Sequence, residues 1–165
     1  VYRYFAIRRG AYDTQTIRGP SSPLERGDEL WFYYMGCRQY AFITSGGNPN
    51  YKDYVPDAGA VCLAVLRRDG FISLDAGEQQ GTLLTKSFKV SGEELFLNLD
   101  AEDGELNVEV LSVDGIPLAT STNIHGNHTV IQIQWKEGKM AELLGQEVYL
   151  LINLRQTKLY SYWLG

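Results

Sequence analysis

The sequence has few of the residues on which reactive centres and membrane spans depend. Its 165 residues include only two cysteines and two histidines, and no apolar run approaches the roughly 18 residues that a membrane span needs. Gly46-Gly47 is not followed by Lys and Ser or Thr, so no phosphate-binding loop is present. The net charge is −5, and basic pairs are isolated. We therefore expect neither a nucleic acid nor a membrane as partner.

The two cysteines are too few for a disulfide framework. Cys37 and Cys62 each lie in or beside an apolar run, LWFYYMGC and AVCLAVL. This context favours two packed thiols, because free cysteine behaves as a small apolar residue. A single bridge in an exported protein is the alternative.

The residues that are abundant indicate β-strands almost throughout. Hydrophobic residues make up 44% and charged residues 21%, as in ordinary globular proteins. Short apolar or alternating runs separated by turn residues are typical of antiparallel sandwiches and barrels. We predict an all-β fold, an antiparallel β-sandwich of jelly-roll type. The predicted strands cover residues 29–35, 61–66, 71–75, 85–90, 94–99, 106–110, 130–135, 148–154 and 158–163.

Asp-Gly pairs recur between these runs and predict tight reversals. Asp69-Gly70 lies between two apolar strands, which indicates a type I′ hairpin with Arg67 and Arg68 at its charged tip. Asp103-Gly104 predicts a second hairpin turn in the same way. One short helical turn is expected at residues 140–144, before Gly145.

A segment rich in Gly, Pro and Asn, residues 45–59, reads as a long loop or linker. It separates an N-terminal piece from a more regularly patterned remainder. We predict an N-terminal β-hairpin segment with its linker at residues 1–57 and the β-sandwich domain at residues 58–165.

Carboxylates cluster in LDAEDGEL. A calcium loop is one interpretation, because hard cations take several oxygen ligands; a solvated hairpin turn is the favoured one. The candidate metal ligands are Asp100, Glu102, Asp103 and Glu105. Asp75 and Glu78 form a catalytic pair only if the fold places a substrate between them. His125 and His128 lack a third zinc ligand nearby, so we expect a polar loop there.

Aromatic side chains are the strongest candidates for a binding surface, because sugar rings stack on flat aromatic faces. Alternation in WFYY places Trp31 and Tyr33 on one face of a strand, and it places Tyr160 and Tyr162 on one face of the last strand. Packing in the core or at an interface is the alternative. The candidate glycan contacts are Trp31, Tyr33, Tyr51, Tyr54, Tyr160 and Tyr162.

One family resemblance runs through much of the chain. GDELWFYYMG followed by LAVLRRDGFISLDAG resembles the last blade of the five-bladed β-propeller in bacterial glycosidase-like proteins related to glycoside hydrolase families 32 and 43. GTLLTKSF, LFLNLDAEDGELNVEVLSVDGIPL and the C-terminal run IQIQWKEGKMAELLGQEVYLLINLRQTKLYSYWL resemble the β-sandwich that follows such propellers. The resemblance spans nearly all of residues 25–165.

The resemblance implies a secreted carbohydrate-associated protein, extracellular or periplasmic, without a cofactor. The family's catalysis needs two carboxylates flanking the scissile bond, and its motifs, which resemble WMNDPNG, RDP and EC, do not occur here. No catalytic residue is therefore expected. The hypothesis is a non-catalytic module. Its expected partners are a polysaccharide, an oligosaccharide or a catalytic propeller domain. A glycoside hydrolase acting on fructan, arabinan or xylan through acidic residues is one alternative, and a protein–protein interaction domain that self-associates is another.

Overall fold

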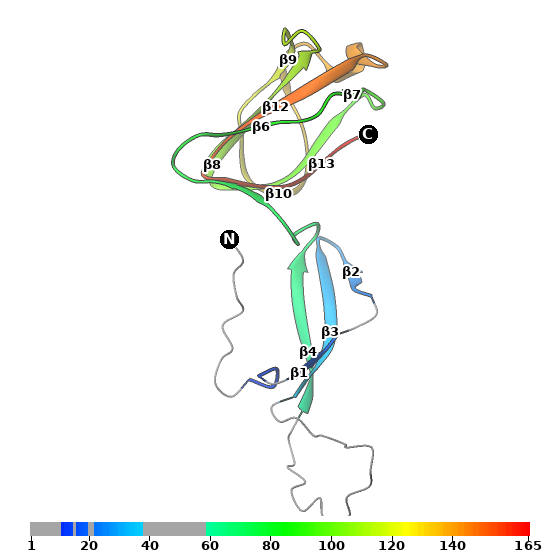
Figure 1. The fold of residues 1–165 in the computed structure, drawn as a ribbon, viewed down its shortest axis with the longest axis vertical. Helices are drawn as coiled ribbons and strands as arrows, with labels where there is room; N and C mark the ends of the chain where they lie inside the picture. Colours follow the sequence, from blue (N-terminus) through cyan, green and yellow to red (C-terminus); the bar gives the residue numbers. More distant parts are fainter. Residues whose placement is uncertain (1–10, 15, 20–21, 38–58) are drawn as a thin grey trace, which may run out of the picture. The chain divides into compact units, whose positions relative to one another are not determined.

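The computed structural model describes residues 11–14, 16–19, 22–37 and 59–165, and these residues form antiparallel strands joined by turns (Figure 1). The predicted all-β sandwich is confirmed. The chain divides into two units, Val1–Leu66 and Arg67–Gly165, and each is described by itself. We expected the boundary at residues 57/58; β4 (Gly59–Arg67) pairs with β3 and belongs to the first unit up to Leu66.

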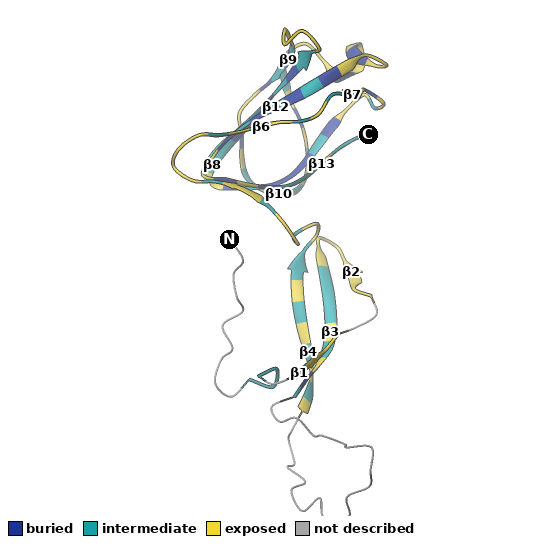
Figure 2. Cartoon of the chain, in the orientation of Figure 1, coloured by how far each residue is buried: buried dark blue, intermediate teal, exposed yellow. Residues whose placement is uncertain are grey.

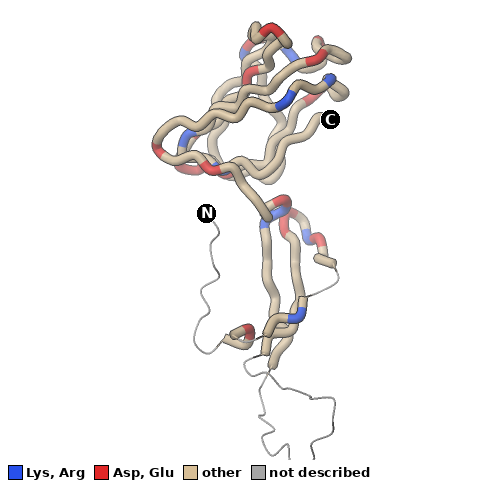
Figure 3. Tube along the Cα trace, viewed as in Figure 1, with Lys and Arg blue, Asp and Glu red and all other residues tan. Residues whose placement is uncertain are grey.

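A four-stranded sheet makes up the described part of the first unit. Its central strand is β3 (Glu29–Cys37), which pairs with β1 (Thr16–Arg18), β2 (Leu24–Arg26) and β4. Alternate residues of β4 are exposed and half-buried, which Figure 2 shows as bands along the strand. Charged residues lie only at the ends of β3 and β4 (Figure 3).

The second unit is a sandwich built on one long strand, β8 (Leu95–Ser112). Within the described residues its sheet has nine strands. The others are β5 (Leu74–Ala76), β6 (Gly81–Leu84), β7 (Phe88–Lys89), β9 (Pro117–Ser121), β10 (Ile124–Gln132), β11 (Trp135–Glu137), β12 (Glu147–Arg155) and β13 (Thr157–Leu164). A 3₁₀ turn at Met140–Leu143 confirms the predicted short helical turn.

The two halves of β8 have different neighbours. Residues 95–100 pair with β13 and residues 105–112 pair with β12, while β10 and β9 follow the opposite edge. Leu95, Leu97 and Leu99 of the first half and Val108 and Val110 of the second are fully buried in one core. The sandwich is therefore a sheet folded over at the middle of β8, so that both halves bury one face in the same apolar core.

Because the sheet folds over, the inward-facing side chains must switch from one set of alternate residues to the other. The buried apolar residues of β8 are odd-numbered up to Ala101 and even-numbered from Leu106. The consecutive strands β12 and β13, which pair with β8, change in the same way. Leu154 is inward before Gln156, and Thr157 and Leu159 are inward after it. Gln156 has a φ of 48°, a left-handed conformation that reverses the alternation. We call residues 101–106 together with residues 155–157 the corner.

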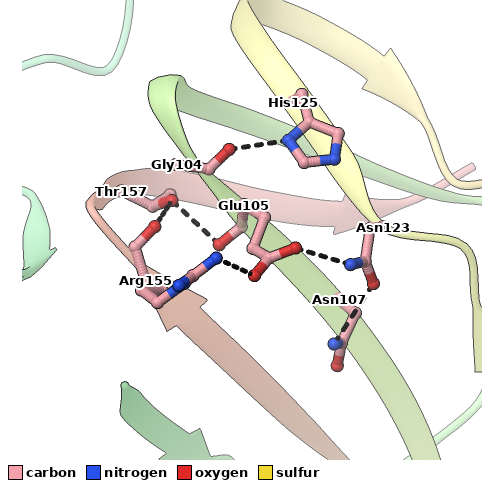
Figure 4. Close-up of polar contacts among 7 residues, drawn as sticks. All are labelled: Gly104, Glu105, Asn107, Asn123, His125, Arg155 and Thr157. Atoms are coloured by element: carbon pink, nitrogen blue, oxygen red, sulfur yellow. Dashed lines mark hydrogen bonds and ion pairs between the residues drawn. The ribbon is translucent and has the colours of Figure 1, made fainter. Parts of the chain in front are cut away.

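Polar contacts hold the corner together (Figure 4). The Thr157 hydroxyl, only 1% exposed, lies 3.0 Å from the Glu105 carbonyl and 2.9 Å from the Arg155 carbonyl. Arg155 forms an ion pair of 2.7 Å with Glu105. Asn123 donates to the other Glu105 oxygen over 2.6 Å. These contacts join β8, β12 and β13 to one another and to Asn123, which directly precedes β10, where the backbone pairing is interrupted.

The corner requires a glycine at position 104, because the neighbouring backbone leaves no space for a Cβ. A Cβ on Gly104 would lie 2.0 Å from the carbonyl oxygen of Arg155 and 2.3 Å from that of Gln156. The prediction of a hairpin turn at Asp103-Gly104 is therefore wrong: β8 continues through both residues, and the glycine permits a close approach of two backbones where the strand bends.

The predicted hairpin at Asp69-Gly70 is also wrong. A turn is present, with the Gly70 amide bonded to the Arg67 carbonyl over 2.9 Å, so its central residues are Arg68 and Asp69. Only Asp69 of these has a positive φ, 57°, so it is not a type I′ turn. The strands on either side do not pair with each other, because β4 pairs with β3 and β5 pairs with β13.

Several predicted strand limits shift. The run at 71–75 forms a strand only at 74–76, the run at 85–90 only at 88–89 after β6, and 130–135 falls at the end of β10 and the start of β11. His125 and His128, expected in a loop, lie within β10. In the described residues, no helix is long and apolar enough to span a membrane.

Gly104→Ala tests the corner. We expect the free energy of unfolding to fall by about 1–3 kcal/mol, because the new methyl forces two backbones apart. Gly77→Ala is the matched control, since a Cβ there meets nothing within 4 Å, and it should change stability by less than about 0.5 kcal/mol. Urea unfolding followed by tryptophan fluorescence measures both. Equal stability of the two variants would contradict the role of Gly104.

Candidate functional site

The first candidate surface is the face of β3 that carries Trp31 and Tyr33. Their ring centroids are 6.2 Å apart, with the ring planes at 58°. The indole N–H of Trp31 donates to Glu29 over 2.8 Å. The Arg26 guanidinium lies 4.6 Å from the centre of the Trp31 ring. These contacts orient Trp31, and Tyr33 beside it is 45% exposed.

The register of the sheet places apolar neighbours on the same face. Leu24 lies directly opposite Trp31 in β2, and Met35 follows Tyr33 by two residues in β3. Leu24 is 55% and Met35 47% exposed. Trp31 and Tyr33 lie two residues apart in β3, so they share one face, in agreement with the prediction. This face is an exposed surface with the charged Arg26 and Glu29 at one end.

The opposite face of β3 carries Tyr34, which the sequence did not single out. Its hydroxyl donates to the Asp13 carboxylate over 2.9 Å. The hydrogen bond to Asp13, together with burial and the charge of Asp13, raises the pKa of Tyr34 from 10.0 to about 12. The Cys62 thiol also faces this hydroxyl. Cys37 and Cys62 are free thiols and half-buried, as predicted.

The second candidate surface contains Tyr160 and Tyr162 of β13. Both line a hollow of about 290 Å³ together with Ile72, Leu74 and Leu159. Tyr162 also borders a wider hollow of about 730 Å³, with Leu83, Phe88 and Leu164. The lining is mainly apolar, and Tyr162 is 39% exposed.

Tyr160 differs from Tyr162 because a cation covers it. The Arg67 guanidinium lies 4.8 Å from the centre of the Tyr160 ring. It also donates to the Asn98 side chain over 2.8 Å, to the Leu99 carbonyl over 3.1 Å and to Asn127. The fully buried Asn98 donates in turn to the Arg68 carbonyl over 2.8 Å. Arg67 therefore connects the start of the second unit to β8, β10 and β13.

Two of the four candidate metal ligands of LDAEDGEL contact side chains of the protein. Glu105 bonds to Arg155 and Asn123 at the corner, and Asp100 lies 3.6 Å from Lys158. Glu102 and Asp103 are exposed on β8. Among the described residues no three His, Cys, Asp or Glu side chains converge as a metal site would require. The structural calcium stays a prediction.

The remaining polar candidates occupy strand positions. Asp75 of β5 lies opposite Lys158 and accepts a hydrogen bond from Ser73, while Glu78 lies in the bend that follows β5. His125 Nδ1 lies 2.7 Å from the Gly104 carbonyl, and His128 Nε2 lies 2.8 Å from the His125 carbonyl. A carbonyl only accepts, so each of these nitrogens carries a proton. Tyr51 and Tyr54 lie outside the described residues.

Comparison with known proteins adds no family assignment. No family model matches the sequence, and no curated protein matches it.

Arg67→Lys tests the connection made by Arg67. We expect the free energy of unfolding to fall by about 2 kcal/mol, because one ammonium group cannot replace the three hydrogen bonds of the guanidinium and leaves the buried Asn98 oxygen without its donor. The neighbouring Arg68→Lys is the control, since the exposed Arg68 contributes its backbone carbonyl to Asn98. Thermal unfolding compares the two. Equal losses from both variants would contradict the assigned role.

The Tyr34 hydroxyl provides a pH-dependent test. Its folded pKa of about 12 lies above the ordinary value of 10.0, so the neutral phenol stabilises the first unit fully below pH 10 and this contribution is lost between pH 10 and 12. Absorbance at 295 nm of the wild type minus that of Tyr34→Phe should show one late-titrating tyrosine. In Asp13→Asn the titration should move to lower pH; an unchanged titration curve would contradict the hydrogen bond as its cause.

Proposed function

We propose that this chain is a non-catalytic, carbohydrate-associated module of a glycoside hydrolase-like protein, and that the β3 face carrying Trp31 and Tyr33 contacts glycan. The observation that carries the proposal is the paired, oriented aromatic rings on an exposed strand face. An exposed aromatic ring on a strand face suits a polysaccharide, because sugar rings stack on aromatic side chains. Tyr33, 45% exposed, is the more open ring of the pair, since the Arg26 guanidinium lies over Trp31.

The charged groups beside the rings support the same assignment. Glu29 accepts a hydrogen bond from Trp31, and the Arg26 guanidinium lies over the Trp31 ring. A guanidinium and a carboxylate suit sugar hydroxyls, which act as both donors and acceptors. Stacking supplies affinity in such a site and the polar groups supply orientation.

Three of the acidic residues weighed as catalytic groups support an accessory role. Asp75 and Asp100 lie opposite the same residue, Lys158, from its two neighbouring strands. Glu105 bonds to Arg155. These carboxylates connect strands of the sandwich, so the sandwich acts as a scaffold in this proposal and the N-terminal sheet carries the contact surface.

Affinity electrophoresis of the full chain through gels containing fructan, arabinan or xylan tests the proposal. We expect retardation by at least one polysaccharide, and Tyr33→Ala should weaken it by about two- to tenfold, which corresponds to the loss of one aromatic contact. Met35→Ala is the matched control, on the same strand face and similarly exposed at 47%. No retardation in any gel, or an equal loss in both variants, would overturn the assignment.

A further inference from the structure

The edge of β13 is only partly covered. On one side β13 pairs with β8 along its length, and on the other it pairs with β5 only through Thr157, Lys158 and Leu159. Among the described strands, none pairs with the outer edge of residues 160–164. Ile72 and Ser73, which precede β5, line the hollow beside Tyr162 together with residues 159–162 of this edge.

The hydrogen bonds of Gly165 fix which backbone groups face outward. Gly165 and Glu94 exchange two hydrogen bonds of 3.0 Å, one in each direction. Because bonding direction alternates along an antiparallel strand, Trp163 also faces β8, and the N–H and C=O groups of Tyr162 and Leu164 face the open edge. The edge therefore presents two donors and two acceptors on alternate residues.

The side chains of residues 159–164 carry no charge of their own, although Ser161 donates to the Asp69 carboxylate over 2.9 Å. Residues 159–164 read Leu-Tyr-Ser-Tyr-Trp-Leu. Natural sheet edges are protected from pairing by charges, prolines or bulges. Two other edges of this sandwich have such features: β10 has two register irregularities against β8, and β11 carries Lys136 and Glu137. β13 has one register irregularity of its own, between Leu159 and Ser161, and the regular stretch that follows it, residues 161–164, contains no charged or proline residue.

We propose that a second copy of this chain adds to the open edge, β13 against β13 in antiparallel pairing, with the two-fold axis at Trp163. Tyr162 then bonds to Leu164 of the second copy, and Leu164 to Tyr162 of the second copy, which satisfies all outward-facing groups of both residues. The uncharged side chains of residues 162–164 favour a second copy, because these are the residues that pair and they meet without like-charge repulsion.

The aromatic side chains fit this register. Trp163 stacks on Phe96 of β8, with ring centroids 5.6 Å apart and planes at 12°. At the two-fold axis Trp163 faces Trp163 of the second copy in a non-hydrogen-bonded pair, where side chains approach most closely. The stack thereby extends to four aromatic rings across four strands. The exposed ring of Tyr162 is covered on the other face of the joined sheet.

Sedimentation of the full chain tests the proposal. We expect a concentration-dependent dimer, and Tyr162→Lys should raise the dissociation constant at least tenfold by placing a charge at the edge. Leu63→Lys in β4 is the matched control, since Leu63 is 41% exposed against 39% for Tyr162, and it should leave the constant unchanged. A monomer at about 200 μM, or dissociation caused by Leu63→Lys and not by Tyr162→Lys, would overturn the proposal.

A disulfide test does not depend on the stability of Tyr162→Lys. In a chain with Cys37→Ser and Cys62→Ser, Trp163→Cys should form an intermolecular disulfide under mild oxidation, because its Cβ lies at the two-fold axis. Val130→Cys, also on an edge strand and 52% exposed, is the control and should remain largely monomeric on a non-reducing gel. Equal cross-linking of both variants, or none in Trp163→Cys, would overturn the register.

Discussion

The structure of the sandwich depends on the reversal of side-chain alternation at the corner of β8. A strand that kept its alternation through all 18 residues would bury one half and turn the apolar side chains of the other half to solvent. Here the reversal occurs between Ala101 and Leu106 in β8 and at Gln156 in the paired ribbon, so both halves contribute to one core. The polar residues around Gly104 serve this geometry. Glu105, Arg155 and Thr157 connect the strands where regular pairing is interrupted.

The three Asp-Gly pairs show what sequence could predict and what it could not. Asp114-Gly115 joins β8 to β9 in a hairpin, with Gly115 at a φ of 79°. Asp69-Gly70 belongs to a turn without a hairpin, and Asp103-Gly104 lies inside a continuous strand. The dipeptide permits a reversal in each case, but the outcome depends on which distant strands pair on either side. For Gly104 those are residues 155–156, about fifty positions further along the chain.

Strand periodicity was more informative: β3, β4, β12 and β13 lie within two residues of their predicted limits.

The same distinction applies to the candidate sites. Local alternation was sufficient to place Trp31 and Tyr33 on one face, because both belong to one regular strand. It did not reveal that Tyr160 is covered by Arg67, since the arginine is 93 residues earlier and its other partners, Asn98 and Asn127, belong to two further strands. Arg67 and Arg68 look equivalent in the sequence, yet one bonds through its side chain to the sandwich and the other is exposed. The Tyr34–Asp13 pair was missed for the same reason, as nothing local connects them.

The continuity of β8 through Asp103-Gly104 is the central claim, and amide hydrogen exchange with nuclear Overhauser measurements tests it most directly. The account predicts that Leu106 and Ala101 amides exchange slowly, and that Glu105 and Arg155 protons lie close together while Asp100 protons lie close to those of Lys158. Rapid exchange throughout residues 100–106, with close contacts between residues 99 and 108 across a local hairpin, would contradict it.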